Sequence, residues 1–184
     1  MLKGMHKDLE PFTYITQKNF LSSELLTQVY NKWKNADHGD YWITCYDDQN
    51  KQLQEHAKKL WRVRKKLVPH TPDMLNILNC NKNDSFFRIM VKVMDPDTSH
   101  HEIHTDADWK QMTTIVYISP EGLGTLFYKG PNEKDFVKEV RWKQNLAYSF
   151  IPANNSWHNF KHLDGMKDKR IVLMFTLCNK TFYR

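Results

Sequence analysis

The chain has 184 residues, of which 40% are apolar and 13% aromatic, and its formal net charge is +6 at pH 7. This length suits one domain with a sizeable core, and the apolar content excludes a disordered chain. The basic balance is compatible with nucleic acid, an anionic surface or an anionic small molecule, and by itself it separates none of them.

Cysteine usage and the lack of long apolar segments favour the cytoplasm. The first eight residues contain no apolar stretch long enough for a signal peptide, and no segment approaches the length of a membrane span. The three cysteines are widely spaced and form no paired motif, which is typical of a reducing compartment. We therefore expect a cytoplasmic protein without a membrane segment, of unknown oligomeric state.

The N-terminal half alternates extended segments with helix patterns. Ser22 is a suitable N-cap, and Leu25, Val29 and Trp33 recur at four-residue spacing, which predicts a helix that ends near residue 35. The other expected elements are extended segments at 12–15 and 41–46, a second helix at 49–67 and a short helix at 73–78.

The predicted helix at 49–67 is strongly basic. Its cationic residues are Lys58, Lys59, Arg62, Arg64, Lys65 and Lys66. We interpret this cluster as a solvated helix face, because no aromatic stacking pattern accompanies it as in proteins that bind single-stranded nucleic acid. Nucleic acid is therefore disfavoured as a partner.

From residue 86 onward the sequence predicts a series of short strands. Turns with Gly and Pro separate them, and no long helix pattern interrupts them. Such a series is typical of a sandwich or small barrel, here mainly β with helices packed outside. The expected strands are residues 87–94, the segment at His104, 111–119, 124–129, 136–142, 147–151, the segment at His158 and 171–178.

The stretch around His104 and Asp106 carries the candidate chemistry. Two residues apart on an extended segment, these side chains point to the same side of the backbone and can reach one metal ion. His158 is the best candidate for a third ligand, and Arg170 follows it twelve residues later at the head of an apolar run. Two histidines and one carboxylate form the ligand set of non-haem Fe(II) oxygenases.

This pattern resembles the family of Fe(II)/2-oxoglutarate-dependent oxygenases, and in particular its prolyl-hydroxylase-like branch. His104 and Asp106 match the HxD motif, His158 matches the distal histidine, and Arg170 stands where a basic residue holds the cosubstrate. Tyr117 resembles the tyrosine that prolyl-hydroxylase-type members place on the strand after HxD to bind the same carboxylate.

The resemblance covers residues 86–178 and implies a fold. It implies a double-stranded β-helix, or jelly roll, at residues 86–184, with a helical N-terminal part at residues 1–85 as its support. Because no repeat, linker or low-complexity tract is present, we expect a single oxygenase domain at residues 1–184.

The resemblance also implies a reaction. His104, Asp106 and His158 would hold Fe(II), and Arg170 would bind the distal carboxylate of 2-oxoglutarate through its planar guanidinium. With O2 as oxidant, 2-oxoglutarate would become succinate and CO2 while a substrate C–H is hydroxylated. Asp106 argues against halogenation, since halogenating members lack the acidic ligand.

Two positions depart from the family pattern, and one further residue is a candidate for binding the cosubstrate. Val172 stands where a serine or threonine is common two residues after the basic residue, so Tyr117 or Thr125 is expected to replace that hydrogen bond. Met94 stands on the strand before HxD where prolyl hydroxylases have a second tyrosine. Lys110 is a second candidate cation for the cosubstrate, ranked below Arg170.

Alternative interpretations stay open for the substrate and for turnover. We place a protein side chain such as prolyl slightly ahead of a free amino acid or other small metabolite, and a non-catalytic metal-binding jelly roll is a third possibility. A structural zinc site at His100, His101 and His104 is disfavoured, because no cysteine lies near. The expected substrate loops, residues 95–101 and 128–135, contain no motif that names a substrate.

Overall fold

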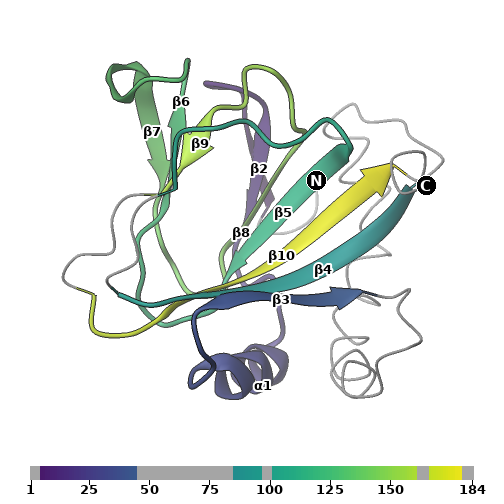
Figure 1. The fold of residues 1–184 in the computed structure, drawn as a ribbon, viewed down its shortest axis with the longest axis vertical. Coiled ribbons are helices and arrows are strands. Elements are labelled where there is room, and N and C mark those ends of the chain that lie inside the picture. Colours follow the sequence, from purple (N-terminus) through teal and green to yellow (C-terminus); the bar gives the residue numbers. More distant parts are fainter. Residues whose placement is uncertain (1–4, 45–84, 97–100, 161–165, 180–184) are drawn as a thin grey trace.

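The computed structural model describes residues 5–44, 85–96, 101–160 and 166–179, whose strands form two antiparallel sheets (Figure 1). The larger sheet has seven strands in the order β1-β2-β8-β5-β10-β4-β3, and the smaller has three in the order β7-β6-β9. This mostly β, antiparallel arrangement is consistent with a jelly-roll-like fold.

In the larger sheet the strands are β1 (Met5–Asp8), β2 (Tyr14–Gln17), β3 (Gly39–Thr44), β4 (Ser85–Met94), β5 (Lys110–Tyr117), β8 (Ala147–Phe150) and β10 (Arg170–Asn179). The smaller sheet contains β6 (Thr125–Tyr128), β7 (Phe136–Val140) and β9 (His158–Asn159), and the helical elements are α1 (Ser23–Trp33) and the 3-10 turn η2 (Glu133–Asp135).

Helix α1 covers the outer face of the larger sheet (Figure 1). The Oγ of Ser22 accepts a hydrogen bond from the Leu25 N–H at 3.3 Å, which satisfies one of the free amides of the first turn. Leu25, Val29 and Trp33 are buried and share one hydrophobic cluster with residues of β4 and β10. The helix predicted from their four-residue spacing is confirmed, with its end at Trp33.

Strand β4 alternates between two environments, as a strand between two layers must. Ile89 and Val91 are buried in the cluster under α1. Arg88, Met90 and Lys92 point from the opposite face into a cavity between the sheets. The inner face of β4, which is paired on both sides, therefore carries two cations in a place where packing alone would favour apolar residues.

Aromatic side chains hold the two sheets together near this cavity. The ring of Phe127, on β6, lies 4.6 Å from Phe12 and 4.9 Å from Tyr14 between ring centroids. Phe150 and Tyr148, on β8, pack against the same ring at 6.5 and 5.8 Å. Each such pair contributes about 0.5–1.5 kcal/mol beyond the burial of its area. These contacts fix β6 opposite β8 and so fix two walls of the cavity.

The N-terminal part differs from the expected helical support. Among its described residues α1 is the one α-helix, and β1, β2 and β3 are strands of the larger sheet. The reason is non-local pairing: β2 pairs with β8, and β3 pairs with β4. The extended segments predicted at 12–15 and 41–46 overlap β2 and β3, but a short segment carries no signal that names a strand partner so distant in sequence. No helix among the described residues has the length and apolar character that a membrane span requires.

Several predicted elements lie outside the described residues, namely the helices at 49–67, with its basic cluster, and at 73–78. The single domain at residues 1–184 stays a prediction. The strand expected at His104 is reduced to one isolated bridge to His158.

Candidate metal centre

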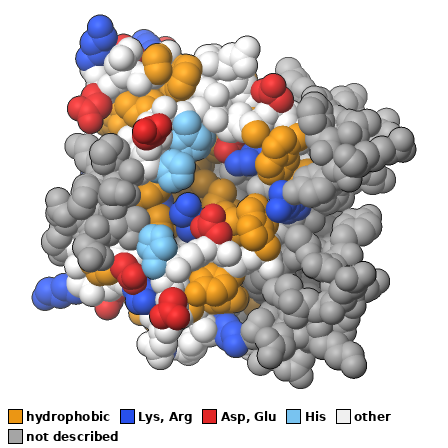
Figure 2. Space-filling view, in the orientation of Figure 1, with side chains coloured by type: hydrophobic (Ala, Val, Ile, Leu, Met, Phe, Trp, Pro, Cys, Tyr) orange, Lys and Arg blue, Asp and Glu red, His pale blue; other side chains and the backbone are white. Residues whose placement is uncertain are grey.

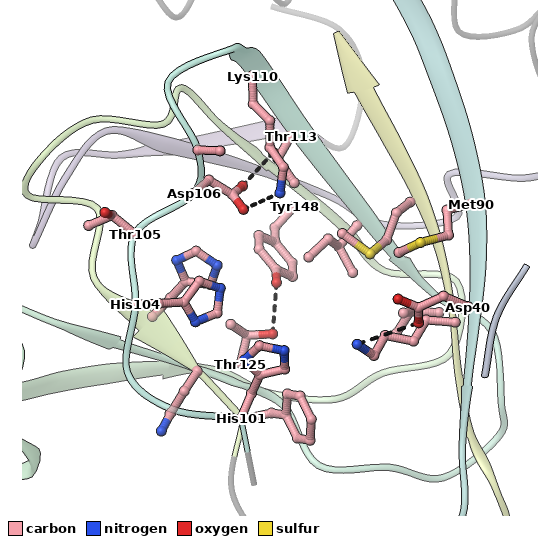
Figure 3. A pocket seen from close by; sticks show the side chains of 18 of the residues that line it. Asp40, Met90, His101, His104, Thr105, Asp106, Lys110, Thr113, Thr125 and Tyr148 are labelled. Carbon is pink, nitrogen blue, oxygen red and sulfur yellow. Dashed lines mark hydrogen bonds and ion pairs between the residues drawn. The ribbon is translucent and has the colours of Figure 1, made fainter. Parts of the chain in front are cut away.

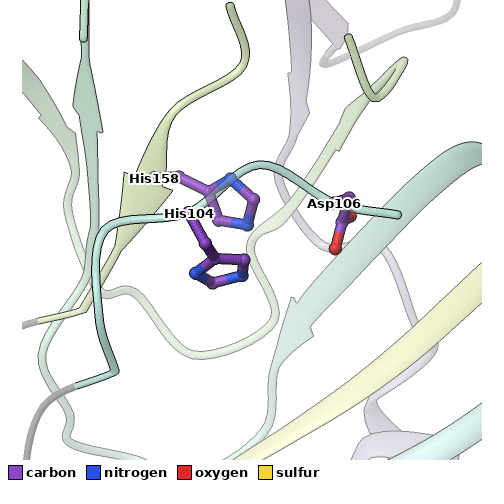
Figure 4. Close-up of side chains that lie close together, drawn as sticks. All are labelled: His104, Asp106 and His158. Atoms are coloured by element: carbon purple, nitrogen blue, oxygen red, sulfur yellow. The ribbon is translucent and has the colours of Figure 1, made fainter. Parts of the chain in front are cut away.

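His104, Asp106 and His158 converge at one end of the cavity. One ligand atom from each of the three lies within 4.8 Å of the others (Figure 4). His104 and Asp106 belong to the segment that leads into β5, and His158 begins β9. The two imidazole centroids are 4.5 Å apart. The structure thus brings together three side chains that the sequence separates by up to 54 residues.

Both imidazoles are oriented by the same kind of hydrogen bond. Nδ1 of His104 lies 2.8 Å from the Glu102 carbonyl oxygen, and Nδ1 of His158 lies 2.8 Å from that of Ser156. Because a carbonyl oxygen only accepts, Nδ1 must carry the hydrogen in each ring and Nε2 keeps its lone pair. Burial lowers the pKa of His158 to about 4, so this imidazole is neutral and able to coordinate at pH 7.

Asp106 is held as a carboxylate by two donors (Figure 3). Thr113 Oγ1 donates to its Oδ2 at 2.7 Å, and Lys110 Nζ forms an ion pair with its Oδ1. Burial acts to raise the pKa of Asp106, but the charge of Lys110, the proximity of His158 and the two hydrogen bonds together hold this pKa below its usual value.

The donor set fits a divalent iron site. Two neutral imidazole nitrogens and one carboxylate suit Fe(II), and three ligands leave coordination positions open toward the cavity. The hydrogen bonds behind the rings are the outer partners that orient ligands in metal sites. Tetrahedral zinc with four protein ligands fits less well, because the cluster supplies three.

The cavity beside the triad has a volume of about 390 Å³. Figure 2 shows this hollow, with histidine, acidic and basic side chains gathered around apolar atoms. In the close-up, Asp40 and Met90 lie on the side opposite His104 (Figure 3). Ile115, Val172 and Met174 supply apolar lining. A cavity of this size and mixed lining is typical of a small-molecule site.

Arg170 is a buried cation that lines this cavity. It is 3% exposed, and its Nε donates to the Leu123 carbonyl oxygen at 3.2 Å. The rings of Phe160 and Trp142 lie 4.4 and 5.2 Å from the centre of its guanidinium. Burial lowers its pKa, and no described carboxylate forms an ion pair with it. A guanidinium so buried is suited to an anionic ligand.

Thr125 lines the cavity, whereas Tyr117 does not. The Tyr117 hydroxyl donates to the Val140 carbonyl oxygen at 2.9 Å, accepts from the Thr125 N–H at 3.0 Å, and its ring stacks on Trp142 at 4.1 Å. Tyr148 occupies the lining instead, with its hydroxyl 2.8 Å from Thr125 Oγ1 (Figure 3). Burial raises the pKa of both phenols, so both stay protonated.

Sequence reasoning missed Tyr148, Thr113, Arg88 and Trp42 as cavity residues. A signal for Arg88 existed, because Arg88 and Lys92 stand on the same face of a predicted strand whose other face carries Ile89 and Val91. No comparable signal marked Tyr148, since an aromatic residue on a strand is ordinary packing. Lys110, expected as a second cosubstrate cation, lies in the lining but is paired with Asp106.

Comparisons with known proteins support the fold. No family model and no curated protein sequence matches the chain. Among solved structures, a prolyl-4-hydroxylase from Pseudomonas putida superposes with a TM-score of 0.58 at 13% identity, covering 94% of this chain and 96% of that one. A Trichoplax adhaerens prolyl hydroxylase in complex with a hypoxia inducible factor oxygen degradation domain peptide superposes with a TM-score of 0.55 at 15% identity, covering 94% and 86%. The chain thus shares the fold of prolyl hydroxylases.

Proposed function

We propose that the protein is an Fe(II)- and 2-oxoglutarate-dependent dioxygenase that hydroxylates an organic substrate. The observation that carries the proposal is that one cavity holds both the His104, Asp106 and His158 triad and the buried cation Arg170. A metal-binding triad alone is compatible with many functions. A guanidinium buried in the same cavity adds a binding partner for a dicarboxylic cosubstrate.

Each residue has a distinct task. His104, Asp106 and His158 would hold Fe(II), which when bound with 2-oxoglutarate and O2 supplies the oxidation of a C–H bond, with succinate and CO2 as co-products. Arg170 would bind the distal carboxylate in a bidentate manner, and the hydroxyls of Tyr148 and Thr125 lie in the same lining to donate further hydrogen bonds. One oxygen atom enters the substrate and the other enters succinate.

Apolar side chains of the lining limit water around the reacting groups. Ile115, Val172 and Met174 come from adjacent strands and stand side by side in the register of β5 and β10. A water-poor lining strengthens the attraction between the cosubstrate carboxylate and Arg170, because fewer dipoles screen it.

A protein side chain such as prolyl is our first candidate for the substrate. The two solved structures described above are prolyl hydroxylases, and one is in complex with a peptide, which supports this choice. A free amino acid or another small metabolite is the alternative.

The direct test is the formation of succinate from 2-oxoglutarate by purified protein with Fe(II) and O2. We expect slow succinate release even without substrate, its loss after removal of iron, and its loss in His104→Ala and Asp106→Ala. Iron binding without any succinate release would contradict the proposal and favour a non-catalytic metal-binding jelly roll. Succinate release by the two variants at the rate of the unmodified protein would show that the triad takes no part in the reaction.

A further inference from the structure

One row of largely apolar side chains crosses the wall that the larger sheet gives to the cavity. Trp42 of β3 pairs with Met90 of β4, and Met90 pairs with Met174 of β10. Met174 pairs in turn with Ile115 of β5, and Ile115 with Tyr148 of β8. Residues directly opposite each other on antiparallel strands share a face, so the five side chains lie side by side. All five line the cavity, and we call them the apolar row.

The apolar row leads from the protein surface to the interior. It spans five neighbouring strands, which makes it about 19 Å long at the usual strand spacing. Trp42, at its outer end, is 39% exposed, whereas Met90, Ile115 and Tyr148 are buried. An apolar ligand that covers the Trp42 ring would remove this remaining apolar surface from water, which is favourable.

The inner part of the apolar row adjoins the metal centre. Thr113 lies two residues before Ile115 on β5, and its Oγ1 donates to Asp106 at 2.7 Å. Residues two apart on a strand point to the same face at a distance of about 7 Å. A group that lies on the row near Ile115 is therefore close to a metal ion held by the triad.

The two ends of the apolar row belong to different ligands under the proposed function. The Tyr148 hydroxyl lies 2.8 Å from Thr125 Oγ1, at the end assigned above to the cosubstrate. Met90 lies on the side of the cavity opposite His104 (Figure 3). The outer part, from Met174 to Trp42, is thus left for the substrate.

The charged groups of the cavity do not call for a charged substrate group. In the described part of the lining they are Asp40, Arg88, Lys92, Asp106, Lys110 and Arg170. Four of them form two ion pairs, Lys92 with Asp40 at 3.5 Å and Lys110 with Asp106. Arg170 is assigned to the cosubstrate, and the Arg88 guanidinium lies against the Trp42 ring at 3.8 Å. The outer part of the apolar row is the remaining surface.

The chemistry of the two methionines selects against charge. A thioether is only a weak acceptor of hydrogen bonds, so it does not replace the water that a charged group loses on burial. Its unbranched, polarizable chain adapts to hydrocarbon groups of different shapes. Met90 and Met174, side by side in the row, therefore favour an uncharged apolar group.

We infer that the outer part of the apolar row, formed by Trp42, Met90 and Met174, binds an uncharged hydrocarbon group of the substrate that contains the hydroxylated carbon. The inference rests on the proposed function for the meaning of substrate and deepens it by naming the group that is recognised. The hydrocarbon group belongs to a small metabolite or to a side chain of a peptide, and the experiment below separates these two sources.

The test is a nuclear magnetic resonance titration of protein labelled with 13C at its methionine methyl groups. Zn(II), which does not broaden the signals, and saturating 2-oxoglutarate occupy the metal centre and the Arg170 end. One series of probes is the primary alcohols from ethanol to hexanol. The other is the N-acetyl N-methylamides of alanine, 2-aminobutanoate, norvaline and norleucine, with that of lysine as the charged counterpart of norleucine.

We expect the methyl signals of Met90 and Met174 to shift, and that of Met112, which is buried outside the cavity lining, to stay. Affinity should rise about fourfold with each added methylene, the factor that corresponds to about 0.8 kcal/mol per buried CH2. The lysine probe should bind at least tenfold more weakly than the norleucine probe. The series with the steeper dependence on chain length identifies the source, the alcohols a metabolite and the blocked amino acids a peptide side chain.

Three variants connect this dependence to the apolar row. Met90→Gln and Met174→Gln keep the length of the side chain but end it in a polar amide, and each should reduce the gain per methylene. Trp42→Gln acts at a partly exposed position and should do the same; it decides the matter if the methionine variants do not fold. Leu9→Gln, at an exposed position outside the cavity, is the matched control and should leave the gain intact.

Several outcomes would overturn the inference. They are unshifted Met90 and Met174 signals with every probe, an affinity independent of chain length, a lysine probe that binds as tightly as the norleucine probe, an unchanged gain in Trp42→Gln, and an equal loss in Leu9→Gln.

The same titrations without metal and 2-oxoglutarate separate this inference from the proposed function. The apolar row consists of protein groups alone, so the dependence on chain length should persist in the metal-free protein. Absence of succinate formation together with an intact dependence would contradict the proposed function only. Succinate formation without that dependence would contradict the hydrocarbon site only.

Discussion

The backbones of His104 and His158 exchange two hydrogen bonds, from His104 N–H to the His158 carbonyl oxygen at 3.1 Å and in the reverse direction at 2.9 Å. This isolated antiparallel bridge puts the two residues directly opposite each other, so both side chains leave the backbone on the same face. The adjacent imidazoles of the triad are thus a consequence of main-chain pairing. Side-chain packing then has only to orient the rings.

Removal of any triad ligand should abolish tight metal binding. We expect His104→Ala, Asp106→Ala and His158→Ala each to weaken Mn(II) binding by more than the roughly 10- to 100-fold that loss of an outer hydrogen-bond partner costs. Calorimetry on folded protein measures this, with His6→Ala on the exposed strand β1 as the matched control. A His158→Ala variant with unchanged affinity would show that another residue is the third ligand.

Arg170→Gln should raise the requirement for 2-oxoglutarate far more than the requirement for iron. The substitution removes a buried charge that is separate from the triad, so we expect the 2-oxoglutarate concentration for half-maximal succinate release to rise about tenfold or more, while the iron requirement changes little. Titrations of 2-oxoglutarate and Fe(II) in the same assay measure both, with Arg141→Gln as control. Equal effects on both requirements would place the anchor elsewhere, with Lys110 next in line.

Lys110→Met should destabilise the metal-free protein and strengthen metal binding. The Asp106 side chain is 6% exposed, so loss of its cationic partner leaves an unpaired buried carboxylate, at a cost of about 3 kcal/mol. The same change removes a cation that competes with the metal for Oδ1. Urea unfolding with and without Mn(II) measures both effects, with the exposed Lys143→Met as control. If the variant loses the same free energy of unfolding with Mn(II) as without it, Lys110 does not compete with the metal for Asp106.

The stability of the metal-free protein should fall as the pH decreases from 6.5 toward 4. Burial lowers the pKa of His158 to about 4 in the folded state from the ordinary 6.5, so in this interval the unfolded chain binds the additional proton. We expect a loss of about 3 kcal/mol in the free energy of unfolding. Urea unfolding at a series of pH values measures it. The loss should disappear in His158→Gln and persist in His6→Ala; a flat profile for the unmodified protein would contradict a buried neutral imidazole.

The amino-acid sequence predicted the residues that converge in the candidate metal centre better than it predicted the architecture. The spacing of His104 and Asp106 and the four-residue repeat of α1 are local patterns, and local patterns are readable without coordinates. The role of β1 and β2 as strands of the larger sheet was not readable, because their partners lie elsewhere in the chain. Short strands gain their stability from such partners, so their own composition says little.

The choice between Tyr117 and Tyr148 shows what only the tertiary structure decided. Both tyrosines are on strands and both face the space between the sheets, but Tyr148 pairs with Ile115 at the level of the cavity, whereas Tyr117 is covered by Trp142 and Thr125. The register between β5 and β8 places Tyr148 beside Ile115, and a shift of β8 by one residue would turn Tyr148 to the other face of the sheet.

The sequence by itself determined which residue types are present for the proposed iron site and the proposed cosubstrate anchor, and that His104 and Asp106 stand at a spacing that lets them act together. The tertiary structure alone decided that His158 joins them, that Arg170 is buried in the same cavity, and that Trp42, Met90 and Met174 stand in one row of its lining. The physical reason is that ligand geometry depends on hydrogen-bonded register between distant strands, and this register arises only when the whole sheet is assembled.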